Sequence, residues 1–136
     1  MIRPLIITTT ATEDSANKYM EIRIIKEKIG RRELEKIAKE NYGDMTKAVV
    51  DIKKEIIAIG GELHADANEI LIKNGSNQKN VWGINIYPDE PESEQIVFDS
   101  LINIRPLANN RSLGVESKEI REKIIKIVNN LIELNG

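Results

Sequence analysis

Hydrophobic and polar residues alternate in several short segments of the chain, and this period of two is typical of half-buried β-strands. The first such segment covers residues 22–27. Three later segments are rich in β-branched and aromatic residues, are separated by turn sequences, and are predicted to be strands as well: Glu69–Asn74, Val81–Tyr87 and Ile96–Arg105.

Residues 44–61 are compatible with two structures. One is a helix capped by Asp44 and ended by the pair Gly60-Gly61. The other is a β-hairpin with strands over Lys47–Ile52 and Glu55–Ile59. The valines and isoleucines of this segment favour the hairpin, because β-branched side chains suit a pleated sheet.

Two segments show the helical period instead. The first is "RRELEKIAKENYG", in which Leu34, Ile37 and Ala38 share a face and Gly43 suits the end of a helix. The second follows Ser117 as its N-cap, and its apolar stripe consists of Ile120, Ile124, Ile127, Val128 and Leu131. The order of elements predicts an α+β fold, with a mainly antiparallel sheet of about five strands and two helices packed on one face.

The 136 residues are enough for one domain. We expect that domain to span residues 20–136, because "MEIRIIKEKIG" from Met20 is a plausible beginning. Residues 1–19 are then an N-terminal appendage, either flexible or contributing an edge strand from Leu5 onward.

Composition narrows the class of protein. The net charge of −2 does not indicate a broad nucleic-acid-binding surface. Cysteine is absent, which excludes disulfides, thiolate metal sites and cysteine nucleophiles and fits a cytoplasmic protein. No apolar run approaches the roughly 20 residues of a membrane helix, so we expect no membrane partner.

Polar side chains gather on one side of two predicted strands. In "VWGINIYP", Asn85 lies opposite the side that carries Trp82, and in "FDSLINIRP", Asp99, Asn103 and Arg105 alternate with apolar residues. If the strands are neighbours, these side chains form a polar site, with Asp99 as a catalytic or Mg²⁺-binding carboxylate and Asn85, Asn103 and Arg105 as ligand contacts. A solvated sheet face without function is the alternative.

The segment "GGELHAD" contains His64, the single histidine of the chain, between Glu62 and Asp66. On a strand all three would point to one side, at a spacing of roughly 6.5–7 Å that seldom suits one metal ion. His64 is therefore a candidate general base, oriented by Asp66 or Glu62, and no metal site is assigned to it. A purely structural histidine is the alternative.

The loop "RPLANNRSLGVES" precedes the last helix. Arg105, Asn110, Arg111 and Ser112 could bind an anion there, because guanidinium groups and the free N–H groups of a helix N-terminus attract carboxylate and phosphate. The alternative is a loop that only caps its helix. The chain has none of the phosphate-binding, nucleophile-elbow or zinc-protease sequence motifs.

The motifs "GGELHAD", "NGS", "VWGINIYPD" and "FDSLINIRP", in this order, resemble a family of short prokaryotic proteins that is known only as a domain of unknown function. The resemblance covers about residues 20–134. Similar members have aspartate and proline before the final helix, where this chain has Ser117-Lys118. The resemblance implies no reaction, substrate or cofactor.

These observations predict a small cytoplasmic protein that binds an anionic ligand, such as a nucleotide or a phosphorylated metabolite, on a polar sheet face. Two alternatives stay open. One is a protein-interaction module, including a homodimer, and the other is a Mg²⁺-dependent hydrolase. No cofactor is assigned.

Overall fold

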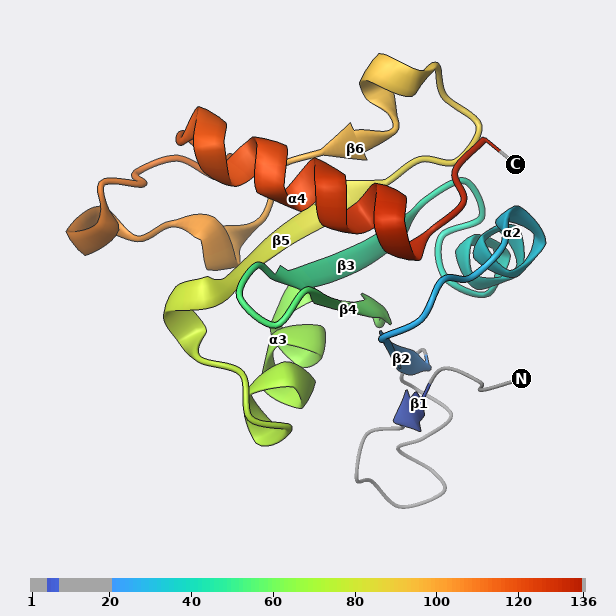
Figure 1. Ribbon diagram of the computed structural model, residues 1–136, viewed down its shortest axis with the longest axis horizontal. Helices are drawn as coiled ribbons and strands as arrows, with labels where there is room; N and C mark the ends of the chain where they lie inside the picture. Colours follow the sequence, from blue (N-terminus) through green and yellow to red (C-terminus); the bar gives the residue numbers. More distant parts are fainter. Residues whose placement is uncertain (1–4, 8–20, 136) are drawn as a thin grey trace.

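The computed structural model describes residues 5–7 and 21–135, which form one antiparallel sheet with helices on both of its faces (Figure 1). The strands are β1 (Leu5–Ile7), β2 (Ile22–Ile25), β3 (Thr46–Asp51), β4 (Ile56–Gly60), β5 (Val81–Ile86) and β6 (Ile96–Val97). Their order in the sheet is β1-β2-β4-β3-β5-β6, and all neighbouring pairs are antiparallel. The predicted α+β class is confirmed.

Three α-helices accompany the sheet, α2 (Arg31–Glu40), α3 (His64–Lys73) and α4 (Lys118–Leu131). Short 3₁₀ turns lie at η1 (Gln78–Asn80), η2 (Glu92–Glu94), η3 (Leu101–Asn103) and η4 (Pro106–Ala108). None of the helices in the described part of the chain is long and apolar enough to cross a membrane.

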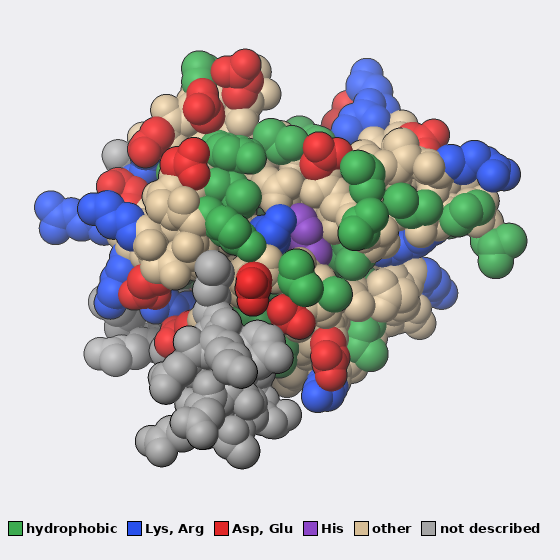
Figure 2. Space-filling model, turned by 180° about the vertical axis from the view of Figure 1, so that it is seen from behind, with side chains coloured by type: hydrophobic (Ala, Val, Ile, Leu, Met, Phe, Trp, Pro, Cys, Tyr) green, Lys and Arg blue, Asp and Glu red, His purple; other side chains and the backbone are tan. Residues whose placement is uncertain are grey.

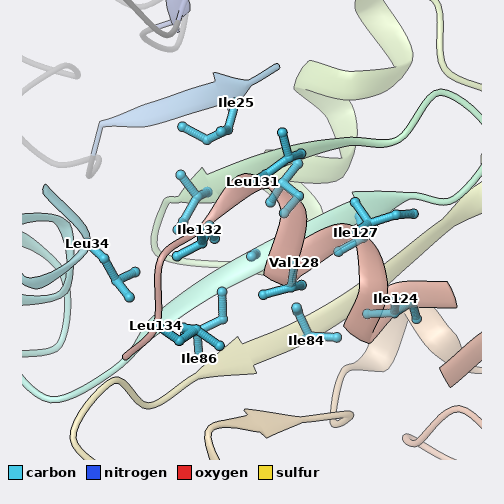
Figure 3. Close-up of a cluster of buried hydrophobic side chains, with 14 of the residues drawn as sticks. Ile25, Leu34, Ile84, Ile86, Ile124, Ile127, Val128, Leu131, Ile132 and Leu134 are labelled. Atoms are coloured by element: carbon cyan, nitrogen blue, oxygen red, sulfur yellow. The ribbon is translucent and has the colours of Figure 1, made fainter. Parts of the chain in front are cut away.

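The larger core lies between the sheet and the two predicted helices, α2 and α4 (Figure 1). Helix α4 begins after Ser117, whose hydroxyl accepts a hydrogen bond from the backbone N–H of Ile120, as expected for its N-cap. Figure 3 shows the apolar stripe of α4 packed across the sheet, and the labelled side chains include Ile84, Ile86, Ile124, Ile127, Val128 and Leu131. Burial of this stripe fixes the position of α4 on the sheet.

The hairpin prediction for residues 44–61 is confirmed. Strands β3 and β4 pair antiparallel, and Asp51 closes the turn between them by accepting hydrogen bonds from the N–H groups of Lys53 and Lys54 at 2.9 Å each. The second carboxylate oxygen of Asp51 accepts a 2.6 Å bond from the hydroxyl of Ser76. A buried aspartate therefore ties this turn to the segment that follows α3.

The predicted strand over residues 69–74 is wrong, because His64–Lys73 is the helix α3. Its buried residues, His64, Ala67, Ile70 and Leu71, recur at helical spacing and pack on the sheet face opposite α4. The sequence Asn74-Gly75 ends this helix, and Gly75 takes the left-handed φ of 100° there. A third helix, which the sequence analysis did not predict, thus covers part of the second face.

The predicted strand over residues 96–105 is correct only for Ile96–Val97. The chain then leaves the sheet, and η3 brings the side chain of Asn103 beside the edge of β5. The amide of Asn103 accepts a 2.8 Å bond from the N–H of Gly83 and donates a 2.9 Å bond to its carbonyl oxygen. The Asn103 side chain therefore bonds the backbone N–H and C=O groups of β5 that a longer strand β6 would otherwise pair with.

At the N-terminus, Leu5–Ile7 pairs with β2 as an edge strand. The other residues of the predicted appendage over 1–19 lie outside the described residues, so the domain boundary near Met20 stays a prediction.

Candidate functional site

A cavity of about 470 Å³ opens on the α3 side of the sheet. It lies between the N-terminus of α3, the strands β3 and β5, and the loop that follows β6. Figure 2 shows this face, with the purple histidine in a hollow surrounded by hydrophobic side chains. The lining residues are Met45, Lys47, Leu63, His64, Ala65, Asn85, Tyr87, Asp99, Ser100, Leu101, Ile102 and Leu113.

His64 is the first residue of α3, and only 7% of its surface is exposed. Its Nε2 lies 2.7 Å from the carbonyl oxygen of Ile84, which can only accept, so Nε2 carries the proton. The neutral ring then presents Nδ1 as an acceptor. Burial lowers the pKa of His64, and the positive charge of Lys47 lowers it further, against the opposing effect of the bond to Ile84. The imidazole is therefore neutral near pH 7.

Asn85 and Lys47 are direct partners across β5 and β3 and point to the same side of the sheet. The Asn85 Nδ2 donates a 2.9 Å bond to the backbone carbonyl of Asp99. Its Oδ1 is buried and has no hydrogen-bond partner among the described residues. Asn85 thus lines the cavity with a side chain that keeps one acceptor without a described donor.

Lys47 supplies the positive charge of the cavity. Its Nζ lies 5.5 Å from the centroid of the Tyr42 ring, a cation–π contact that restrains the side chain. Within residues 5–7 and 21–135, no carboxylate forms an ion pair with it. Lys47 can therefore bind an anionic group without first breaking a described salt bridge.

Gly83 permits the close approach of the segments that build the cavity. A Cβ at this position would lie 2.6 Å from the Cβ and Oγ of Ser100 and 3.1 Å from the Cδ2 of His64. Any larger residue would push η3 or α3 away from β5. The glycine of "VWGIN" is therefore a packing requirement of the site.

Apolar side chains form the rim. Leu63, Leu101 and Leu113 are 57%, 78% and 42% exposed, which is unusual for leucine, and Met45 and Ile102 continue the apolar lining. Exposed apolar residues gathered around a polar floor are typical of binding sites.

The structure brings three of the predicted site residues, His64, Asn85 and Asp99, to this cavity. Sequence analysis missed Lys47, Ser100 and the leucine rim. Lys47 could be found only from the strand register, which places it opposite Asn85.

The predicted arrangement of Glu62, His64 and Asp66 on one side of a strand is wrong, because α3 begins at His64. Glu62 is exposed and precedes the helix, while Asp66 lies in the first turn of α3, where a negative charge favours the helix dipole. Neither residue lines the cavity, and the described hydrogen bond of the His64 ring goes to the carbonyl of Ile84 and not to either carboxylate.

Asn103 and Arg105 do not share a strand face with Asp99, because the strand ends at Val97. Beyond its two bonds to Gly83, the amide of Asn103 donates to the carbonyl of Leu113 at 3.0 Å. The guanidinium of Arg105 stacks on the Trp82 ring at 4.2 Å and donates to the carbonyl of Val81. These polar groups serve internal contacts away from the cavity.

The predicted anion-binding loop already holds an anion, the carboxylate of Glu116. One oxygen of Glu116 accepts bonds from the N–H groups of Arg111 and Ser112, at 2.5 and 3.0 Å. These bonds lower the pKa of Glu116. The Asn110 amide donates to three backbone carbonyls of the loop and its Oδ1 accepts from the N–H of Glu116. Asn110, Arg111 and Ser112 thus build the loop itself.

No three histidine, cysteine, aspartate or glutamate side chains are grouped to hold a metal ion within the part of the chain that the structure describes. Asp99 is the single acidic residue among the described residues that line the cavity.

These features define the class of protein, a small α+β protein with an antiparallel sheet whose second face carries an amphipathic cavity. The chain belongs to the family described as "Protein of unknown function (DUF5674)", whose family model matches residues 23–131. The match includes every described residue that lines the cavity. No curated protein and no solved structure matches the chain.

Proposed function

We propose that the cavity beside His64 binds a small molecule that has a negatively charged head group and an apolar body. The observation that carries this proposal is Lys47, a cation that lines the cavity and forms no ion pair with a carboxylate of the described residues. An anionic head group can therefore pair with Lys47 without breaking a described salt bridge.

The size of the cavity agrees with this function. Ligand pockets usually measure roughly 300–1,000 Å³, and the volume of about 470 Å³ lies in that range. The apolar rim from Leu63, Leu101 and Leu113 offers surface that a ligand can bury. Burial of that surface favours binding by the hydrophobic effect.

The single described cation of the cavity, Lys47, can pair with one negative charge of a ligand. The guanidinium groups of Arg105 and Arg111 do not line the cavity, and Asp99 adds a negative charge to its wall. A carboxylate fits a single ammonium group. A nucleotide or a phosphorylated metabolite, as expected from the sequence, has weaker support because it would bring two or more negative charges to one lysine.

The test is an NMR titration with 4-methylpentanoate, which combines a carboxylate with a branched apolar chain. We expect shifts of the His64 ring signals, unique in this sequence, and of the Asn85 side-chain amide. Lys47→Gln should weaken binding by about tenfold or more, as expected for loss of a charged partner. Lys79→Gln, at an exposed position, is the matched control. Absence of shifts at millimolar probe would contradict the proposal.

The exposed leucines favour a second candidate function, a protein-interaction module that forms a homodimer. Leu101 and Leu107 are 78% and 104% exposed, and a second copy of the chain that covered them would bury apolar surface. Sedimentation velocity over a range of concentrations tests it. A dimer that Leu107→Lys disrupts supports this function, and a monomer at all concentrations contradicts it.

A Mg²⁺-dependent hydrolase has the weakest support, because a single described carboxylate, that of Asp99, lines the cavity. Asp99→Asn should abolish a Mg²⁺-dependent hydrolysis if this function holds, and an unchanged rate contradicts it.

We also propose a cytoplasmic location, a prokaryotic origin and a domain boundary near Met20. They are supported by the absence of cysteine and by the family-like motifs.

A further inference from the structure

We infer that the ligand of the cavity is an α-amino acid with an aliphatic side chain, bound as a zwitterion. Its carboxylate would pair with Lys47, and its ammonium group would donate to the Oδ1 of Asn85 and to the carboxylate of Asp99. This inference rests on the proposed ligand-binding function and names the class of ligand.

The first argument is the count of donors and acceptors. Three described residues that line the cavity carry acceptors, Asn85 with an unpartnered amide oxygen, the neutral His64 and the acidic Asp99, against the single ammonium group of Lys47. A simple carboxylate ligand satisfies Lys47 but donates to none of these acceptors. An ammonium group carries three N–H donors and therefore complements the acceptors that a carboxylate leaves unpaired.

The second argument is the arrangement of the charges. Lys47 and Asn85 are cross-strand partners, and side chains at such positions are about 4.5–5.5 Å apart at Cβ. Asp99 is held next to Asn85 by the 2.9 Å bond from the Asn85 Nδ2 to the Asp99 carbonyl. A positive and a negative residue thus adjoin the same unpartnered acceptor, as the neighbouring carboxylate and ammonium groups of an α-amino acid require.

The third argument is the character of the remaining wall. Met45, Leu63, Leu101, Ile102 and Leu113 are aliphatic and border the polar floor. They suit a side chain such as that of leucine or methionine. His64 adds no competing positive charge, because burial lowers its pKa and keeps the ring neutral.

Three probes of matched shape test the inference by isothermal calorimetry and by the His64 ring signals. L-Leucine carries both charges, 4-methylpentanoate lacks the ammonium group, and 3-methylbutylamine lacks the carboxylate. We expect leucine to bind about tenfold or more tightly than either partial probe, since each lost charged hydrogen bond is worth at least that factor.

The outcomes separate this inference from the function on which it rests. Equal binding of leucine and 4-methylpentanoate overturns the amino-acid inference and leaves the proposed binding of anions intact. Binding of none of the three probes, or equal binding of leucine and the amine, overturns both.

Substitutions then assign the two charges. Asp99→Asn should weaken leucine binding without weakening that of 4-methylpentanoate, which loses only a repulsion, whereas Lys47→Gln should weaken both. Asp44→Asn, at an exposed position outside the cavity, is the matched control. Unchanged leucine affinity in Asp99→Asn would overturn the inferred contact with the ammonium group.

Discussion

The Nε2–H of His64 donates a 2.7 Å hydrogen bond to the backbone carbonyl of Ile84, which joins the first residue of α3 to the strand β5. This bond fixes the tautomer of the ring and its orientation at the cavity. It also places an ionisable group in a buried position, with 7% of its surface exposed.

The first prediction concerns the pH dependence of stability. Because the pKa of His64 is lowered in the folded protein, the unfolded chain binds a proton at this histidine more tightly than the folded protein does. The contribution of neutral His64 to the free energy of unfolding should therefore be fully present above the ordinary histidine pKa of about 6.5. The free energy of unfolding should fall as the pH drops below that value. Urea denaturation at a series of pH values measures this fall. In His64→Gln, which removes the only histidine, the curve should be flatter between about pH 7.5 and 5.5; identical slopes would contradict the prediction.

The second prediction concerns the close approach at Gly83. Gly83→Ala should destabilise the protein by about 1–3 kcal/mol, the usual cost of overpacking, because the new methyl group would meet Ser100 and His64. The His64 ring signals should move as well. Gly30→Ala is the matched control, since a Cβ there finds its nearest neighbour, a carboxylate oxygen of Glu133, at 3.9 Å. Equal stability of the two variants would contradict the prediction, because it would mean that η3 can move away from β5 without loss of stability.

The sequence predicted those parts of the fold in which burial follows a local period. Trp82, Ile84 and Ile86 alternate with Gly83 and Asn85, and the structure places the two sets on opposite faces of β5. The stripe of α4 was equally clear. The apolar run Ile70-Leu71-Ile72 was predicted as part of a strand but lies in α3, because a short run of such residues suits a strand or a helix. The pair Asn74-Gly75 does not distinguish the two, since it suits a turn after a strand as well as the end of a helix.

The candidate site was predictable in part, for a related reason. His64 was recognisable as the single histidine, and Asn85 and Asp99 as polar residues in predicted strands, and all three line the cavity. Lys47 was not, because its position opposite Asn85 depends on the pairing of β3 with β5. Sequence periodicity contains no information on strand order, so contacts between distant segments cannot be predicted from it.

The third prediction tests the role of Asn103 as a substitute for a strand. Asn103 is fully buried, and its amide makes the two bonds to Gly83 and one to Leu113. Asn103→Ala should cost on the order of 3 kcal/mol, since it leaves buried backbone groups unpaired. Hydrogen exchange of the Gly83 amide should accelerate. Asn68→Ala, which breaks an exposed amide pair with Gln78, is the control and should cost far less; similar losses in both variants would contradict the prediction.

The fourth prediction concerns the carboxylate in the loop before α4. The N–H groups of Arg111 and Ser112 should titrate with Glu116 in an NMR pH series, at a midpoint below the ordinary glutamate pKa, because their bonds favour the charged carboxylate. The contribution of these bonds to stability is present above the ordinary glutamate pKa and is lost as the pH falls through the lowered one. The Lys79 amide is the control, since it donates to the Asn77 side-chain oxygen, which does not titrate. In Glu116→Gln the titration of both loop amides should disappear, and its persistence would contradict the assignment.

The fifth prediction separates Arg105 from ligand binding. Its guanidinium stacks on Trp82 at 4.2 Å and donates to the carbonyls of Val81 and Ile102. Arg105→Lys should reduce the free energy of unfolding by about 1–3 kcal/mol, because an ammonium group cannot stack and donate in this fork geometry.

Urea denaturation followed by the fluorescence of Trp82, the single tryptophan of the chain, measures this loss, and the emission of the folded state should change as well. Arg32→Lys is the matched control at an exposed position and should leave both quantities unchanged. The affinity for 4-methylpentanoate should be the same in Arg105→Lys as in the wild type, because Arg105 does not line the cavity. A variant that keeps its stability but loses affinity would place Arg105 at the binding site after all, and would mean that the anion contact extends beyond Lys47.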